Sequence, residues 1–247
     1  MRGAMRALAA IALCLLGRAA HAQPSATGTW VLTQYWIAAE APRVEDRRAV
    51  PLHDRHGRVL TYACENFASC LCMEGTGRTW DGRLLNWDAR VQGRACFTEV
   101  DTNLYPYGVG VQGFALVPYR SLAVDPRFIP LGHVVEIPAL QGIPLPDGST
   151  HDGCFVAVDG GGAIDGHHID LFLPSIETWR RLGRANLLPS RVTVEIDSAR
   201  CAYATRYAIH PVPGDPLPDL RLHRESPLPA AADAGLAPPP PRRRRRQ

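Results

Sequence analysis

The chain has no lysine, since all 27 of its basic residues are arginine, and it has no C-x-x-C pair. Arginine is concentrated at the two ends, and residues 23–210 hold 17 basic against 20 acidic residues, a net charge of −3. A folded part that is mildly acidic lacks the basic surface of a nucleic-acid-binding protein. The composition therefore argues against nucleic acid as a partner. No strand–turn pattern typical of a serine or cysteine nucleophile is present either.

The first 22 residues carry the marks of a secretory signal. A basic start is followed by the apolar run Ala7–Leu16 and by the small-x-small site Ala20-His21-Ala22. The apolar run is too short to span a membrane comfortably. A lipid anchor on Cys14 is the alternative, but that cysteine lies inside the apolar run. We therefore expect an exported protein that begins near Gln23.

Removal of the signal leaves an even number of cysteines, which in an exported chain predicts disulfides. The sequence does not choose among their pairings. A zinc site built from the first four is the alternative, although no histidine lies between them and the C-x-x-C spacing is missing. No metal site is therefore expected. The six cysteines expected in disulfides are Cys64, Cys70, Cys72, Cys96, Cys154 and Cys201.

The order of patterns along the chain predicts a mainly β fold. Residues 29–38 are rich in β-branched and aromatic residues and read as a strand, with Thr33 and Tyr35 on one face. Residues 40–107 break the rhythm and hold four of the six cysteines, so we expect a disulfide-pinned insertion there. From residue 108 short apolar runs alternate with Pro and Gly turns, as in a small β-barrel. One short helix is predicted over residues 174–182, capped by Ser175.

After residue 210 the composition changes to Pro, Ala and Asp and ends in Arg242–Arg246. Such a segment cannot bury enough apolar surface to fold, so residues 211–247 are expected to be a disordered tail. The arginine run would be attracted to an anionic envelope surface. The alternative is a solvated tail with no dedicated partner. The predicted organisation is thus a signal, one folded domain over 23–210 and a tail.

Three aspartates occupy the most distinctive stretch of the chain. Asp125 ends the run Leu-Ala-Val and precedes Pro126, Asp159 ends Val-Ala-Val and precedes three glycines, and Asp170 lies between Ile and Leu-Phe. If these carboxyls converge, mutual repulsion and burial would raise at least one pKa and leave a proton to donate. The pattern indicates an acid catalyst acting on a glycosidic or similar bond.

The three blocks S-L-A-V-D-P-R-F-I-P-L-G, D-G-G-G-A-I-D-G and I-D-L-F resemble the 3D (three-aspartate) domain family of cell-wall proteins, which includes the catalytic part of a membrane-bound lytic transglycosylase. The resemblance covers roughly residues 108–200 and the first strand. It implies a six-stranded double-psi β-barrel, peptidoglycan glycan strands as partner, no cofactor, and the periplasm or cell envelope of a bacterium. This chain departs from the family at Gly160, usually Thr or Arg, and at Asp165, usually Lys.

In the reaction that the resemblance implies, one carboxyl protonates the glycosidic oxygen between MurNAc and GlcNAc and then takes a proton from the C6 hydroxyl. The product is a 1,6-anhydro sugar, formed without water. Asp170, in apolar surroundings, is expected to be this acid and base. Asp159 would hold Asp170 or the sugar, and Asp125 would act with them or tie down its turn. The residues expected to contact substrate are Thr33, Tyr35, Glu74, Gly161, Gly162 and Ala163.

Other functions stay open at this point. An expansin-like protein that binds or loosens cell-wall polysaccharide would keep the acidic site without cleaving, and the departures at Gly160 and Asp165 favour that alternative. Hydrolysis with water would need a second acid, for which Glu74 is the candidate. A metal held by His167, His168 and Asp159 is disfavoured, because adjacent strand residues point to opposite faces.

Overall fold

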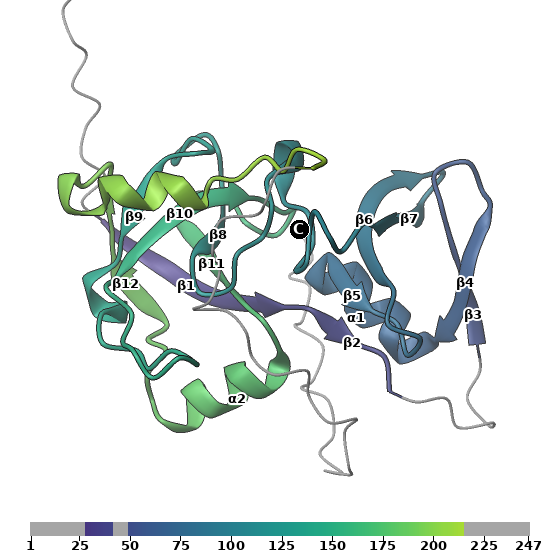
Figure 1. The fold of residues 1–247 in the computed structure, drawn as a ribbon, viewed down its shortest axis with the longest axis horizontal. Helices are drawn as coiled ribbons and strands as arrows, with labels where there is room; N and C mark the ends of the chain where they lie inside the picture. The colour runs from purple at the N-terminus through teal and green to yellow at the C-terminus, as the bar shows by residue number, and fades with distance from the viewer. Residues whose placement is uncertain (1–27, 42–48, 215–247) are drawn as a thin grey trace, which may run out of the picture.

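The computed structural model describes residues 28–41 and 49–214. The predicted signal and the predicted tail beyond residue 214 lie outside the described residues. A large sheet and its surroundings form one part of the molecule, and residues 38–41 and 49–100, called the small lobe below, form the other (Figure 1). None of the described helices is long and apolar enough to cross a membrane.

The large sheet contains seven strands in the order β12-β1-β11-β8-β10-β9-β13. Strands β1 and β11 are parallel, β8 and β10 are parallel, and β11 joins the two pairs by running antiparallel to β8. The strands are β1 (Thr29–Trp36), β8 (Ser121–Val124), β9 (Val134–Glu136), β10 (Cys154–Asp159), β11 (His168–Leu173), β12 (Arg191–Thr193) and β13 (Glu195–Ile196).

The two faces of this sheet have different neighbours because successive side chains in a strand point to opposite sides. Leu32, Leu122 and Ile169 belong to the main hydrophobic core. The residues between them, such as Tyr35, Ala123 and Phe172, belong to a second cluster on the other face. The second face carries the candidate functional residues.

The mainly β class that the sequence predicts is confirmed. Among the described residues, no strand pairing joins β12 to β13, so the sheet is open in its hydrogen bonding. The expected six-stranded double-psi closure stays a prediction. The last of the apolar runs forms two short strands instead of one, since β12 pairs with β1 whereas β13 pairs with β9.

The small lobe has its own sheet and its own core. Its sheet has the order β2-β5-β6-β7, beside the hairpin β3-β4 and the helix α1. Phe67 and Leu71 of α1 pack on Leu52, Leu85 and Phe97. The elements are β2 (Ala38–Ala39), β3 (Ala49–His53), β4 (Val59–Cys64), α1 (Glu65–Glu74), β5 (Thr76–Arg78), β6 (Leu84–Val91) and β7 (Arg94–Val100).

The expectation that disulfides pin this segment is wrong, because Cys64, Cys70, Cys72 and Cys96 are free. Apolar packing holds the lobe instead, and Cys64 and Cys70 lie against its hydrophobic core. Cys70 and Cys72 are both on α1 and Cys96 is buried on β7. Free cysteines commonly occupy such sites as small apolar side chains.

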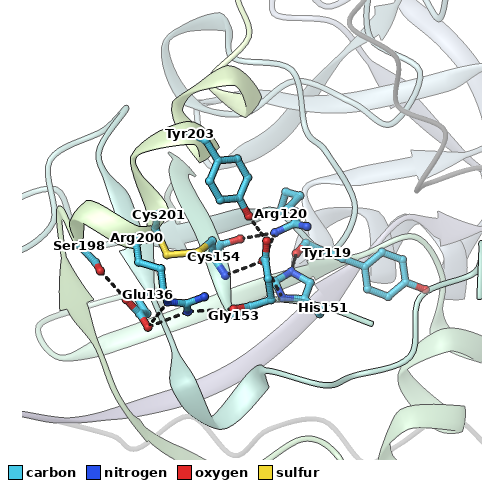
Figure 2. The surroundings of a disulfide bond; sticks show 11 residues. Tyr119, Arg120, Glu136, His151, Gly153, Cys154, Ser198, Arg200, Cys201 and Tyr203 are labelled. Atoms are coloured by element: carbon cyan, nitrogen blue, oxygen red, sulfur yellow. Dashed lines mark hydrogen bonds and ion pairs between the residues drawn. A yellow bond between two sulfur atoms is a disulfide. The ribbon is translucent and has the colours of Figure 1, made fainter. Parts of the chain in front are cut away.

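Within the described part of the chain one disulfide is present, between Cys154 of β10 and Cys201 of the 3₁₀ helix η3 (Ala199–Tyr207). Figure 2 shows the bond beside Arg120, whose guanidinium donates to the Cys154 carbonyl at 2.7 Å and to Asp152 at 2.6 Å. Asp152 also accepts from the Tyr203 hydroxyl of η3. The disulfide and this polar network together hold η3 on the sheet.

The predicted short helix is confirmed as α2 (Ile176–Arg184), with the Ser175 hydroxyl accepting from the Thr178 N–H at 3.2 Å. Helix α1 and η3 were not predicted. Two further 3₁₀ turns, η1 (Val111–Gly113) and η2 (Pro138–Leu140), complete the described elements.

Candidate functional site

Four residues form a row across the second face of the large sheet. Thr33 of β1 is paired with Asp170 of β11, Asp170 with Ala123 of β8, and Ala123 with Asp159 of β10. Residues directly opposite one another in neighbouring strands project to the same side. Two of the three predicted aspartates and the predicted Thr33 are therefore brought to one face.

Asp159 reaches this face because β10 is irregular at its end. The register of β10 on β8 shifts between Ala157 and Asp159. Regular alternation would place Asp159 with Phe155 and Ala157, which belong to the main core. A bulge turns the side chain that follows it, and bulges are frequent beside active sites. The bulge thus converts a core-facing position into a site residue.

Tyr35 connects the two sides of the site. Its hydroxyl donates to Asp159 Oδ2 at 2.9 Å, and its ring lies 5.1 Å from that of Phe172. Strands β1 and β10 are separated by β11 and β8, so a flat sheet would hold them about 14 Å apart. The hydrogen bond shows that the two strands converge over this face.

The Asp159 carboxyl is enclosed yet retains some solvent access. It accepts hydrogen bonds from the Tyr35 hydroxyl and the Gly160 N–H, each at 2.9 Å, and these bonds together with the nearby Val111 N–H favour its charged form. Desolvation outweighs them and raises the pKa of Asp159 from 3.8 to about 6. Asp159 can therefore gain or lose a proton at mildly acidic pH.

Tyr35 lies in a strongly acidic environment. Burial, followed by the charge and hydrogen bond of Asp159 and the charges of Asp170 and Glu74, raises the pKa of Tyr35 well above its ordinary value. The hydroxyl therefore stays protonated and acts as a donor throughout the neutral range. The same causes show that three carboxyls, from β10, β11 and α1, lie near one hydroxyl.

His168 is a site residue for which the sequence prediction considered only a metal role. Its Nδ1 lies 3.2 Å from the Ala163 carbonyl and its Nε2 lies 2.7 Å from the Thr33 hydroxyl. Because a carbonyl can only accept, the neutral ring carries its hydrogen on Nδ1 and accepts from Thr33 at Nε2. His167 faces the other way and packs 4.6 Å from the Trp30 ring. The two histidines thus point to opposite sides, as predicted.

Asp125 has different surroundings from the other two aspartates. It is buried, pairs with the Arg127 guanidinium at 2.5 Å and accepts from the Gly166 N–H at 2.8 Å. The Arg127 hydrogen bond is the main cause that holds the pKa of Asp125 far below its ordinary value. Arg127 also bridges to Asp165. These contacts favour the turn-holding role for Asp125, and the departure at Asp165 is part of the same clamp.

The glycine-rich loop, residues 160–166, is held at three points. Asp159 accepts from Gly160, His168 donates to Ala163, and Asp125 accepts from Gly166. Gly161, Gly162 and Ala163 are nevertheless exposed. A side-chain carbon added at Gly162 would meet nothing within 4 Å, whereas one at Gly160 would lie 3.2 Å from the Val124 carbonyl. The loop therefore offers open backbone beside a close-packed first glycine.

Glu74 lies at the edge of the site and connects it to the small lobe. The residue is buried at the end of α1, and its Oε2 accepts from the Trp36 N–H at 3.1 Å. Gly75 follows in the left-handed conformation with φ of +80° and ends the helix there. Glu74 Oε2 is engaged by the backbone of β1. The predicted contact of Glu74 with substrate therefore stays a prediction.

Comparison with known families supports the resemblance on which the site prediction rested. Residues 120–187 match the model of the 3D domain. The match contains Asp125, Asp159 and Asp170, so the resemblance to 3D domains is confirmed over this stretch. No curated protein matches the sequence.

Among solved structures, the chain is similar to MltA from Escherichia coli with bound chitohexaose, at 16% identity and a TM-score of 0.49, over 68% of this chain and 71% of that chain. A membrane-bound lytic murein transglycosylase from Agrobacterium tumefaciens is similar at 15% identity and 0.45, over 71% and 76%. The lytic transglycosylase LtgG of Burkholderia pseudomallei is similar at 19% identity and 0.41, over 68% and 71%. Likeness at these levels carries no argument about activity.

Proposed function

We propose that this protein is an exported lytic transglycosylase that cleaves the glycan strands of peptidoglycan in the bacterial cell envelope. The observation that carries the proposal is the placement of Asp159 and Asp170 on one face, beside Tyr35 and an open glycine-rich loop. The 3D domain match over residues 120–187 supports the same conclusion. The proposal includes a double-psi topology for the large sheet.

Asp170 is the general acid and base in this proposal. It lies between the small residues Thr33 and Ala123 in the row of paired residues, on the face that also carries Asp159. Protonated Asp170 gives its proton to the glycosidic oxygen as the bond from that oxygen to C1 of MurNAc breaks. The C6 hydroxyl oxygen of the same sugar then bonds to C1, and its proton passes to the Asp170 carboxylate. The acid is regenerated and no water is consumed.

Asp159 is the electrostatic partner of this reaction. When ionised, it faces the positive charge that develops on the sugar ring, and the Tyr35 hydroxyl keeps its oxygen in place. The exposed backbone of Gly161 and Gly162 allows a sugar to approach closely. A site with this division of roles needs no cofactor, and Glu74 is not required as a second acid.

The test is the muropeptide pattern released from purified sacculi, read by mass spectrometry. We expect 1,6-anhydro ends from the wild-type protein and a loss of at least about 10²-fold in Asp170→Asn, which keeps the shape and removes the transferable proton. Asp197→Asn is the matched control, because Asp197 is exposed at the surface and, at φ of +56°, sits in a conformation that asparagine tolerates.

Each other outcome contradicts the proposal in a different way. Reducing ends would indicate hydrolysis with water. Binding without release would indicate the expansin-like alternative. Near-normal release by a well-folded Asp170→Asn variant would remove Asp170 from the role of acid.

A further inference from the structure

The side chain of Asn86 joins the small lobe to the segment that borders the site. Asn86 lies on β6 and is buried. Its Nδ2 donates to the Val109 carbonyl at 2.7 Å, and its Oδ1 accepts from the Val109 N–H at 3.1 Å. The amide thus pairs with both backbone groups of one residue, as a neighbouring strand would. Thr76 of β5 donates to the same Oδ1 at 3.3 Å and orients the amide.

The segment that Asn86 holds leads directly to Asp159. Val111, two residues beyond Val109, carries a backbone N–H that acts to lower the pKa of the nearby Asp159 carboxyl. Between them, Gly110 lies against the end of β10, and a side-chain carbon there would stand 2.4 Å from the Val158 carbonyl. The segment is therefore pressed onto the strand that carries Asp159. Because Gly110 is packed so closely, a displacement of Val109 should be transmitted to Val111.

We propose that Asn86 is a positioning residue of the site: it holds the Val109–Val111 segment against the end of β10, beside Asp159. The inference rests on the proposed function only in treating Asp159 as part of the reacting site. It gives the small lobe a part in the chemistry although none of its carboxyls donates the proton. Asn86 is uncharged, so it acts on Asp159 through geometry alone.

Other groups also act on Asp159, and they are independent of Asn86. Tyr35 of β1 donates to it, and the Asp159 and Asp170 carboxyls share one face of the sheet. Glu74 of α1 lies near Tyr35 and accepts from the Trp36 N–H, which gives the small lobe a second connection to the site. Removal of Asn86 leaves these groups in place and withdraws only the support of Val111.

The experiment follows the titration of the Asp159 carboxyl by ¹³C NMR in protein labelled at aspartate Cγ, with the resonance assigned by its loss in Asp159→Asn. We expect the titration midpoint to move upward by about 0.5–1 pH unit in Asn86→Ala, because displacement of the Val111 N–H removes a backbone dipole that favours the carboxylate. Asn86→Ser, which keeps a polar group facing Thr76, is the milder variant and should shift the midpoint in the same direction.

Leu52→Ala is the matched control, since Leu52 is buried in the core of the small lobe and takes part in neither of the two hydrogen-bonded connections to the site. It should loosen the lobe and leave the Asp159 midpoint unchanged. An unchanged midpoint in both folded Asn86 variants would overturn the inference, and so would an equal shift in Leu52→Ala. If the shift appears while the wild-type protein releases no muropeptides, the positioning role stands and the proposed function fails.

Discussion

Asp159→Asn should gain stability relative to the wild type as the pH rises from acid to neutral. The pKa of Asp159 rises from 3.8 to about 6 on folding, because burial disfavours the charged carboxyl. A group with a raised folded pKa contributes stability that is fully present below the unfolded value, near 3.8, and is lost as the pH rises through about 6. Asparagine does not titrate, so the variant lacks this loss.

The size of the effect follows from the two pKa values. One pKa unit corresponds to about 1.4 kcal/mol, so a rise from 3.8 to about 6 amounts to about 3 kcal/mol, to order of magnitude. The free-energy difference between Asp159→Asn and wild type should change by this amount, in favour of the variant, between about pH 3.5 and pH 7.5. Any loss of hydrogen bonding from Tyr35, Gly160 or Val111 adds an offset that does not depend on pH.

The assay is urea unfolding of both proteins at a series of pH values, with the difference in unfolding free energy plotted against pH. Most other titrating groups cancel in this difference. Asp170 does not cancel if it interacts with Asp159, so the comparison is repeated in an Asp170→Asn background. If the stability curves of variant and wild type stay parallel across the whole pH range in both backgrounds, ionisation of Asp159 does not lower the free energy of unfolding, and the reasoning is refuted.

Two further predictions concern single contacts. Tyr35→Phe keeps the ring contact with Phe172 and removes the donor to Asp159. We expect a loss of about 1 kcal/mol in unfolding free energy and an upward shift of the Asp159 titration midpoint measured by NMR. An unshifted midpoint would contradict the hydrogen bond. Cys201→Ser opens a disulfide of sequence separation 47, which should cost about 4 kcal/mol by the chain-entropy relation. Reductant should lower the wild-type thermal midpoint to that of the variant and leave the variant unchanged, whereas equal sensitivity of both would point to bonds among the other cysteines.

The strands and α2 could be predicted because their signals are local. Residues 29–36 alternate between two faces, and Ser175 precedes α2 with the hydroxyl that caps it. The three aspartates could be found from their motif. The surroundings of each carboxyl could not, because Arg127 pairs with Asp125 from two residues away while Asp159 is turned to the second face by a bulge. Neither the ion pair nor the bulge leaves a mark in hydrophobic periodicity.

The small lobe was harder to predict for a physical reason. An even cysteine count in an exported chain favours disulfides, but pairing depends on which residues meet in three dimensions. Here Phe67 and Leu71 supply a core that needs no bond between the four cysteines. Asn86 and His168 escaped the site prediction because their partners, Val109 and Thr33, are distant in sequence. Only the fold reveals such pairs.

The pairing of β1 with β11 has a consequence for how the molecule is made. The side chains of Thr33 and His168 are hydrogen-bonded to each other, although the two residues are 135 positions apart in the sequence. At about 5–20 residues per second, synthesis separates them by roughly ten seconds. The small lobe between them is built from contiguous residues and can fold during that wait. The first strand must stay unpaired with β11 until late, so the acidic groups meet only when most of the chain is complete. Refolding should accordingly be limited by this long closure, as is usual for sheets of distant strands.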